Sequence, residues 1–443
     1  MSIQRIKMTI DFYKYLFLLN KRQAITLIIN VIIFLISLSS MIQNITDFGS
    51  FDIFVGVIFI FSIFNVTWDI IGKISDIKSF IGNEKEIELN KKITLTKENV
   101  NFQLKDIQAE SREGVYYENF DFNSADDNNR VIRSLNINEH LWDTNFSMVH
   151  SQQRYNRIFE FIVKNRVIIT PFIKYQYYNS VRKQQMFFNE DKLCMGSDLT
   201  MNNKAIKYYK SNYYNSFLTN EISTKVLKRT EDATVLYDAS NFYPAELGNS
   251  ETVNIQPLEK SAMSNHIGAS TLAVSADNYL IIRRQGKNAQ QNQNKLISTG
   301  SGSCDFSDLK NENLNDTVEY AMNRELWEEN GGDKLGIKID EIGETKVIGY
   351  YRVLSRGGKP EFAGITKLNW DYSDLVSNKN ELIDISNSAD TDTYYLESVE
   401  SIPNAIKSLK NQPNISTSLY MCIDALEYYY LKRPDELKAF LML

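Results

Sequence analysis

The sequence predicts an α/β protein built from three successive parts. Two long apolar stretches lie close to the N-terminus, and strand patterns followed by an amphipathic helix occur after residue 253. The region between them mixes strand-like and helix-like patterns. We therefore expect a two-helix transmembrane hairpin in residues 1–93, an α+β module of unknown role in residues 94–253, and an α/β domain in residues 254–443.

Length and composition favour a folded protein of several domains. The chain has 443 residues, of which 43% are hydrophobic and 23% are charged. Its net charge is −6, with 49 basic against 55 acidic residues, so broad phosphate neutralisation on a DNA or RNA duplex is not indicated. The three cysteines are far apart and the three histidines are scattered, which favours neither a disulfide framework nor a zinc site.

The first part of the chain has the composition of two membrane spans. The stretch "LIINVIIFLISLSSMI" contains no charged residue, and a span requires about 20 mostly apolar residues. We expect the first span at about residues 23–43 and the second at about residues 51–72, where Asp52 and Asp69 lie near the two ends. A buried core helix is the alternative interpretation.

Positive charges flank this hairpin on both sides. The connecting segment "NITDFGS" has no basic residue, whereas the segments before the first span and after the second have several. These basic residues are Arg5, Lys7, Lys14, Lys21, Arg22, Lys73, Lys78 and Lys85. The positive-inside rule then predicts a multi-pass protein with both termini in the cytoplasm and a cytoplasmic helical extension up to residue 93.

Two asparagines lie inside the predicted spans. Asn30 is early in the first span and Asn65 is late in the second, so an antiparallel hairpin places both at a similar depth. Polar side chains are costly in lipid and tend to bond with one another. The two amides can bond within one hairpin, or between the subunits of a homo-oligomer embedded in the lipid bilayer.

The middle region shows local patterns but no motif that carries chemistry. The segment "RVIITPFIKYQYY" (residues 166–178) is rich in β-branched and aromatic residues, which predicts a strand. The segment "YYKSNYYNSFLTNE" (residues 208–221) forms an aromatic stripe. Such a stripe usually packs in a core, and stacking on a nucleobase is the alternative.

The C-terminal part has a regular order of strands and helices. "STLAVSADNYLIIRRQ" (residues 270–285) predicts a strand, a tight turn and a second strand. "NKLISTGSGSCDF" adds a short strand and a Gly/Ser loop, and "KVIGYYRVLSRGGKPEFAGITKL" predicts two further strands. A helix is expected from about Thr317 to Asn330 with Asp316 as its cap, and another over "STSLYMCIDALEYYYLKR".

The first of these helices carries three glutamates on one face. Glu325, Glu328 and Glu329 follow the i, i+3, i+4 spacing that brings side chains together, and like charges at this spacing repel. A hard divalent cation such as Mg²⁺, which prefers oxygen ligands, would offset the repulsion. A solvated acidic helix face is the alternative for the glutamates taken alone.

The stretch "RELWEENGG" (residues 324–332) resembles the second half of the Nudix box, in which Arg-Glu-apolar-x-Glu-Glu-x-Gly follows a strand and a loop. The resemblance covers roughly residues 254–443 and implies an α/β/α sandwich around a mixed sheet. It implies that Glu325, Glu328 and Glu329 hold Mg²⁺ with Arg324 in support. Its usual chemistry is water attack on a nucleoside diphosphate that is linked to another group.

The first half of the box departs from the pattern. An ungapped alignment places Asp316 where the family has Glu and Lys310 where it has Gly, so the loop glycine is instead Gly300 or Gly302. Hydrolysis is therefore expected to be slow, narrow or absent. Glu361 is a candidate for a further carboxylate. The candidates for receiving phosphate are Arg283, Arg284, Arg352, Arg356 and Lys359.

The combination of two spans with a Nudix-like domain resembles the membrane effectors of cyclic-oligonucleotide-based antiphage signalling (CBASS) in bacteria. The resemblance implies that the domain binds a nucleotide or cyclic oligonucleotide and that the hairpins assemble to disrupt the inner membrane. The alternative is a membrane-tethered, Mg²⁺-dependent Nudix hydrolase acting on a nucleoside diphosphate derivative. A membrane-anchored scaffold with an inactive box is a third interpretation.

Overall fold

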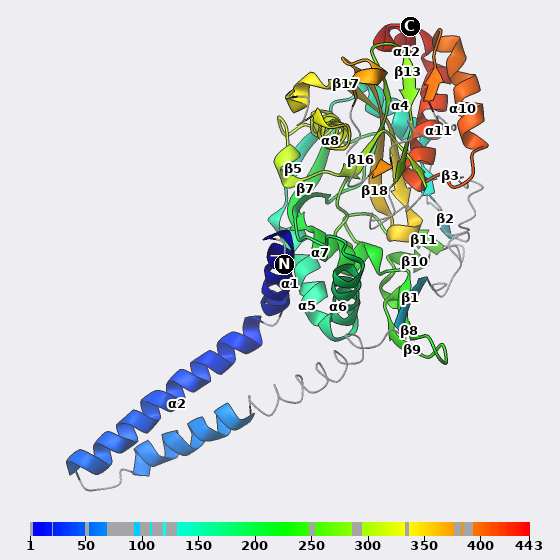
Figure 1. Cartoon of the computed structure of the whole chain (residues 1–443). Helices are drawn as coiled ribbons and strands as arrows, with labels where there is room; N and C mark the ends of the chain where they lie inside the picture. Colours follow the sequence, from blue (N-terminus) through cyan, green and yellow to red (C-terminus); the bar gives the residue numbers. More distant parts are fainter. Residues whose placement is uncertain are drawn as a thin grey trace.

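The computed structural model describes most of the chain after residue 130 and shorter segments before it (Figure 1). The described residues are 3–19, 21–48, 53–68, 93–97, 107–108, 118–120, 131–247, 253–285, 295–332, 336–375, 382–383 and 393–443. The predicted cytoplasmic extension of the hairpin, residues 74–92, lies outside the described residues.

A mixed sheet forms the centre of the molecule. Its strands follow the order β20-β13-β12-β18-β17-β4-β3, and β16 pairs with β12 at the side of this path. β12 and β18 are parallel, whereas the other pairs are antiparallel. The strands are β3 (Glu118–Phe120), β4 (Val131–Arg133), β12 (Gly268–Val274), β13 (Tyr279–Ile281), β16 (Gly300–Ser303), β17 (Gly343–Val353), β18 (Lys359–Leu368) and β20 (Thr393–Tyr395).

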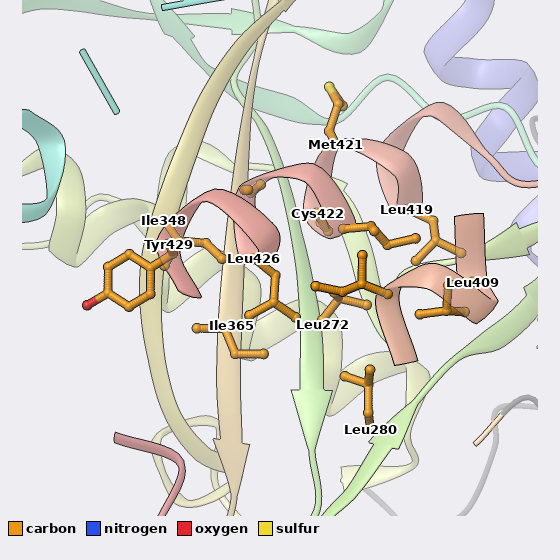
Figure 2. Close-up of a cluster of buried hydrophobic side chains, with 14 of the residues drawn as sticks. Leu272, Leu280, Ile348, Ile365, Leu409, Leu419, Met421, Cys422, Leu426 and Tyr429 are labelled. Carbon is orange, nitrogen blue, oxygen red and sulfur yellow. The ribbon is translucent and has the colours of Figure 1, made fainter. Parts of the chain in front are cut away.

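Helices cover both faces of this sheet. α8 (Leu314–Glu329) packs on one face, where its Val318 and Met322 meet Phe362 of β18. α10 (Ile402–Lys410) and α11 (Thr417–Lys432) pack on the opposite face, where Leu272 and Ile365 meet the apolar side of α11 (Figure 2). The helix α12 (Pro434–Leu441) follows α11. Because neighbouring strand residues point to opposite faces, one sheet supplies both cores.

In the described residues, four smaller sheets and several short helical turns accompany the central sheet. The sheets pair in the orders β1-β8-β9, β10-β11-β2, β15-β14-β19 and β5-β7-β6. Their strands are β1 (Ile93–Lys97), β2 (Ile107–Gln108), β5 (Ser147–His150), β6 (Asp191–Met195), β7 (Ala205–Asn212), β8 (Lys225–Arg229), β9 (Val235–Asp238), β10 (Ala245–Leu247), β11 (Val253–Ile255), β14 (Arg283–Gln285), β15 (Leu296–Ile297) and β19 (Leu382–Ile383). The 3-10 turns are η3 (Ser240–Phe242), η4 (Phe306–Asp308), η5 (Ile339–Glu341), η6 (Leu354–Arg356), η7 (Tyr372–Asp374) and η9 (Val399–Ser401).

The strand pairs and helices predicted for the C-terminal part are confirmed, but the predicted Gly/Ser loop is wrong, because Gly300–Ser303 forms strand β16 and pairs with β12. β12 and β13 are joined by a tight turn in which Asn278 has a φ of +68°, a left-handed conformation that asparagine tolerates. β17 and β18 flank Gly357 and Gly358, which also have positive φ values. The second predicted helix is α11. Short-range patterns of apolar residues and turn residues mark these elements, so the sequence alone predicts them well.

The start of α8 differs from the prediction. The helix begins at Leu314, and its cap is Asn313, whose side chain accepts a hydrogen bond of 3.1 Å from the backbone N–H of Asp316. Asp316 is therefore inside the first turn and is not the cap. Asparagine and aspartate are both favoured caps, so the pattern alone did not distinguish them.

The predicted strand over residues 166–178 is wrong, because this segment lies in helix α6 (Arg166–Lys183). Its buried residues Ile169, Phe172, Ile173 and Tyr177 follow helical spacing. Burial of this face outweighs the strand preference of β-branched and aromatic residues. Helix α5 (Gln152–Lys164) precedes it.

The aromatic stripe of residues 208–221 contributes mainly to a core. It spans the end of β7, the short helix α7 (Tyr213–Ser216) and a π-helix, η2 (Phe217–Glu221). Tyr209, Tyr214 and Phe217 are buried against α5 and α6. Core packing of these side chains is therefore confirmed, and only Tyr213 is partly exposed among the tyrosines at 209, 213 and 214.

The central sheet continues into the middle region of the chain. β4 pairs with β17, and β3 pairs with β4. Helix α4 (Leu135–Asp143) also contacts β17, and the indole N–H of Trp142 donates a hydrogen bond of 2.9 Å to the carbonyl of Ile348. The middle region therefore supplies strands and a covering helix to the same sheet.

The N-terminal helix α1 (Ile3–Leu19) packs against the helices of the middle region. Met8, Phe12, Tyr15 and Leu19 lie on one side and are buried in the core that α5 and α6 form. The ring of Phe12 stacks on Tyr177 of α6 with ring centres 3.9 Å apart. Tertiary packing therefore accounts for the apolar face of α1.

The predicted transmembrane hairpin and the inner-membrane localisation are contradicted. In the part of the chain that the structure describes, no helix combines the length and apolar character that a membrane crossing requires. The helix that corresponds to the second span covers residues 53–68.

The segments predicted as spans do pair with each other. α2 (Lys21–Phe48) runs beside helix 53–68, and the hydroxyls of Ser37 and Ser62 are 2.9 Å apart. The rings of Phe34 and Phe59 stack with centres 5.7 Å apart. This helical pair extends away from the body of the molecule, at the lower left of Figure 1.

Replacing Phe12 by Ala should destabilise the protein by about 3–5 kcal/mol, because a fully buried aromatic side chain is lost from the α1 interface. Phe17→Ala is the matched control on the same helix, since the Phe17 side chain is 57% exposed. Thermal and chemical unfolding of the two variants measures the difference. Equal effects of the two substitutions would show that α1 does not dock as described.

Candidate functional site

The candidate site lies where α8 passes over β16 and the loop that follows it. α8 contributes Arg324, Glu325 and Glu328, and β16 contributes Gly302 and Ser303. The turn η4 adds Asp308. The i and i+4 spacing places Arg324 and Glu328 on the same side of the helix, so the site is built from one helical turn above a glycine-containing strand.

Arg324 joins these groups through its guanidinium. Its Nε and Nη2 donate hydrogen bonds of 2.9 Å to the two oxygens of Asp308, and Nη2 also donates to the carbonyl of Ser303 at 3.1 Å. Its Nη1 lies 2.9 Å from Glu325 and 3.3 Å from Glu328. Burial alone would lower the pKa of Arg324, but the carboxylates of Glu325 and Asp308 raise it well above its usual range. The guanidinium therefore remains charged.

Asp308 is a site residue that sequence reasoning missed. Its side chain is almost fully buried and also accepts a hydrogen bond of 2.7 Å from the backbone N–H of Asp305. It lies in the segment between the Gly/Ser loop and α8, which does not align with the first half of the box. The paired acidic residues of "CDFSD" were the only signal in the sequence, and they are equally typical of a turn.

Glu325 is a buried carboxylate that rests on a glycine. A Cβ atom at Gly302 would overlap with the Glu325 carboxylate, so the absence of a side chain there makes room for it. The Glu325 side chain is 12% exposed, and its burial raises its pKa to about 7 despite the neighbouring Arg324. Of the two loop glycines that the sequence offered, Gly302 is the one beside this carboxylate.

The other two glutamates of the predicted metal face have different environments. The Glu328 side chain is 47% exposed, although desolvation still raises its pKa. Glu329 is buried and is directed differently from Glu328 by its position on the helix. Within the residues described, no group of three or more His, Cys, Asp or Glu side chains is arranged to hold a metal ion.

The test of fit for Mg²⁺ is therefore met in part. Glu325 and Glu328 supply hard oxygen donors from one turn of α8. Burial disfavours the charge of both carboxylates and therefore raises the pKa of each. A divalent cation would relieve this cost. The third carboxylate predicted for the face, Glu329, does not join them in a three-ligand cluster.

Strand β6 of the middle region also contributes to the site. Lys192 lies 3.0 Å from Glu190 and donates to Asp305 at 2.5 Å. Asp305 in turn lies 3.8 Å from Arg324. The ion pairs thus continue from the middle region into the α8 site.

The basic residues predicted to receive phosphate are spread over different parts of the fold. Arg283 donates a hydrogen bond of 2.6 Å to Asn330 at the end of α8, and Arg284 lies in β14. The guanidinium of Arg352 is buried and donates to backbone carbonyls, including that of Gly358 at 3.0 Å. The hydrogen bond of Arg283 therefore connects it to the residue that follows the last turn of α8.

Arg356 and Lys359 meet Glu361 in a separate ion-pair cluster. Arg356 pairs with Glu221 and lies 3.2 Å from Glu361, and the buried Lys359 also pairs with Glu361. A Cβ atom at Gly268 would overlap with the Glu361 carboxylate. Glu361 belongs to this cluster, on the strand side away from α8, and the structure does not place it with Glu325.

Lys310 and Asp316, which the ungapped alignment placed in the box, lie beside another part of α8. They border a shallow pocket of about 630 Å³ together with Glu319, Tyr320 and Glu344. The Lys310 ammonium lies 3.7 Å from the centre of the Tyr320 ring, and Asp316 accepts a 2.9 Å hydrogen bond from Asn311. These contacts explain the positions of both side chains, and neither residue belongs to the candidate site.

Comparisons with known proteins add little at the sequence level. No protein-family model and no curated protein matches the chain. Among solved structures, the chain is similar to DR0079 from Deinococcus radiodurans, with 12% identity over 36% of this chain and 81% of that one, at a TM-score of 0.25. It is also similar to a MutT protein from Methanosarcina mazei, with 16% identity over 38% of this chain and 95% of that one, at a TM-score of 0.24. TM-scores this low carry no argument, so the description of the site depends on its own geometry.

The stability of the protein should fall as the pH rises from about 4.5 to about 7, in part because of Glu325. The folded state holds this proton up to a pKa of about 7, whereas the unfolded chain releases it near 4.5. The folded state therefore binds more protons in this window, and the loss amounts to at most about 3 kcal/mol. Chemical unfolding at several pH values measures it.

Glu325→Gln should make this pH dependence shallower, since the amide does not titrate. Glu397→Gln, at an exposed position, is the matched control and should leave the slope unchanged. An identical slope in wild type and Glu325→Gln would contradict the burial of a neutral Glu325 carboxyl group.

Proposed function

We propose that residues 254–443 form a Nudix-like domain that binds Mg²⁺ and hydrolyses a nucleoside diphosphate derivative. The observation that supports it most is the placement of Glu325 over Gly302, with Arg324 joining Glu325, Glu328 and Asp308. Burial raises the pKa of Glu325 to about 7, so keeping this carboxylate charged without a partner cation costs free energy. Buried carboxylates with shifted pKa values are common where a protein binds a cation or transfers a proton.

The side chains of this site have distinct roles in the proposal. Glu325 and Glu328 would hold Mg²⁺, which would offset the charge of a diphosphate and polarise a phosphoryl oxygen. Asp308 holds the Arg324 guanidinium, and Arg324 orients the two glutamates.

A second candidate is recognition of a nucleotide without cleavage. It is favoured by the arrangement of the glutamates, which in the described residues do not form a cluster of three metal ligands. In this case the domain would recognise a nucleotide or cyclic oligonucleotide as a signal, the role that the resemblance to antiphage signalling implied. The membrane-disrupting step is not part of this candidate, because it depended on the hairpin spans.

The two candidates give different results in one assay. The full chain is incubated with Mg²⁺ and a panel of ADP-ribose, dinucleoside polyphosphates and cyclic dinucleotides, and the products are separated by anion-exchange chromatography. The hydrolase proposal predicts cleavage of a diphosphate bond that chelation of Mg²⁺ abolishes. Binding in calorimetry without any product would instead support recognition alone.

Glu325→Gln and Glu328→Gln should each lower the rate of cleavage by about a hundredfold or more, because they remove charge from the cation site. Glu319→Gln is the matched control on the same helix, since Glu319 accepts a hydrogen bond from the backbone of Val347 on another side of α8. The proposal fails if all three variants retain the wild-type rate.

A further inference from the structure

Several buried polar atoms near the π-helix η2 have no hydrogen-bond partner among the described residues. They are both ring nitrogens of His266, the Nδ2 of Asn265 and the Oγ of Ser216. All three residues have an exposed fraction of 0%. More than about nine in ten buried polar groups in proteins are bonded, so such a group of exceptions indicates a partner outside the chain.

The backbone around these atoms is firmly held. The Asn220 side chain of η2 bonds twice to Asn265, accepting from its backbone N–H at 2.8 Å and donating to its side-chain oxygen at 3.1 Å. Thr219 accepts a 3.0 Å hydrogen bond from the backbone N–H of Ser264. Asn265 itself has a φ of +50°, a left-handed conformation that asparagine tolerates. The unbonded atoms are therefore fixed in position, as a binding site requires.

His266 is neutral at physiological pH. Burial, together with the positive charges of Lys359, Arg356 and Lys192, lowers the pKa of His266 well below its usual range. A neutral imidazole has one N–H donor and one acceptor nitrogen. The ring therefore presents one group of each kind, and Asn265 adds a second donor.

The charges around His266 do not favour an anion. The three cations Lys192, Arg356 and Lys359 are already paired with carboxylates. Those carboxylates are Glu190, Asp305, Glu221 and Glu361. Lys225 also lies 3.8 Å from Glu221, so four cations face these four carboxylates. There is no positive surplus, so the missing partner is a neutral group that offers both a donor and an acceptor.

An aromatic ring lies next to the imidazole. The Tyr213 ring centre is 6.4 Å from that of His266, with the planes tilted by 42°. Tyr213 is partly exposed and the Arg356 side chain is 23% exposed, whereas His266 is fully buried. A planar ligand that entered past them would lie beside an aromatic face, which favours a nucleobase.

Strand β6 connects the surroundings of His266 to the α8 site. Lys192 bridges to Asp305, and two residues further along the same strand Cys194 bridges to His266. Alternate residues of a strand are about 7 Å apart. The backbone of His266 therefore pairs with β6 about 7 Å from the point at which the backbone of Asp305 pairs with it.

We infer that His266, Asn265 and Tyr213 form a nucleobase subsite, with the His266 imidazole bonding to the edge of the base. The inference depends on the proposed function, because it places the base of the nucleotide beside the site that takes its diphosphate. The base would reach the imidazole past the side chains of Tyr213 and Arg356, which are partly exposed.

The direct test uses the three histidines of the chain as probes. The ring ¹⁵N resonances of the full-length protein are recorded while adenosine, guanosine, cytidine or uridine is added in the absence of metal. At least one nucleoside should shift the His266 resonances and leave those of His140 and His150 in place. The inference is overturned if no nucleoside at millimolar concentration shifts His266, or if a crystal structure with nucleoside shows only ordered water at both ring nitrogens.

Variants separate this inference from the proposed function. His266→Gln should weaken nucleoside binding by about tenfold or more, whereas His150→Gln, at an exposed position, should have no effect. Glu328→Gln should leave nucleoside binding intact and weaken Mg²⁺ binding. Nucleoside binding that is unchanged in His266→Gln overturns the subsite, while unchanged Mg²⁺ binding in Glu328→Gln overturns the proposed cation site only.

Discussion

The contacts of the Arg324 guanidinium hold the candidate site together. Its donors bind Asp308, the carbonyl of Ser303, Glu325 and Glu328, which come from a turn, a strand and a helix. A buried arginine needs such partners, because leaving its charge unpaired costs several kcal/mol. The same ion pairs keep α8 in register above β16 and so fix Glu325 over Gly302. The positive charge of Arg324 therefore offsets the repulsion between the carboxylates on this face of α8.

The middle region of the chain belongs to this arrangement. It adds β3 and β4 to the central sheet, and through Lys192 of β6 it extends the ion pairs of the α8 site. Its π-helix η2 packs on the loop that leads into β12 and on the turn η6 between β17 and β18. π-Helices are frequent at functional sites because their extra residue re-aims side chains. A region without a chemical motif in its sequence thus borders both proposed subsites.

The sequence predicted features whose signals are local and missed those that depend on distant contacts. α8, α11 and the strand pairs β12–β13 and β17–β18 were identified, because periodicity and turn residues mark them. The α6 segment was assigned as a strand, since its helical spacing of buried residues competes with β-branched composition. The spans were inferred from apolar composition, yet in the described residues no helix is suited to cross a membrane. Asp308 and the burial of Arg352 and Lys359 depend on partners far away in the sequence, which no local pattern reveals.

We propose that Glu325 and Glu328, joined through Arg324, form a cation site. Anomalous diffraction from crystals of the full chain grown with Mn²⁺ tests it most directly, because Mn²⁺ takes the oxygen ligands that Mg²⁺ does and is visible at its absorption edge. If the two glutamates form this site, an anomalous peak will lie in contact with the carboxylates of Glu325 and Glu328. A fully bound Mn²⁺ elsewhere, with the Glu325 and Glu328 carboxylates still paired to Arg324 alone, would contradict it.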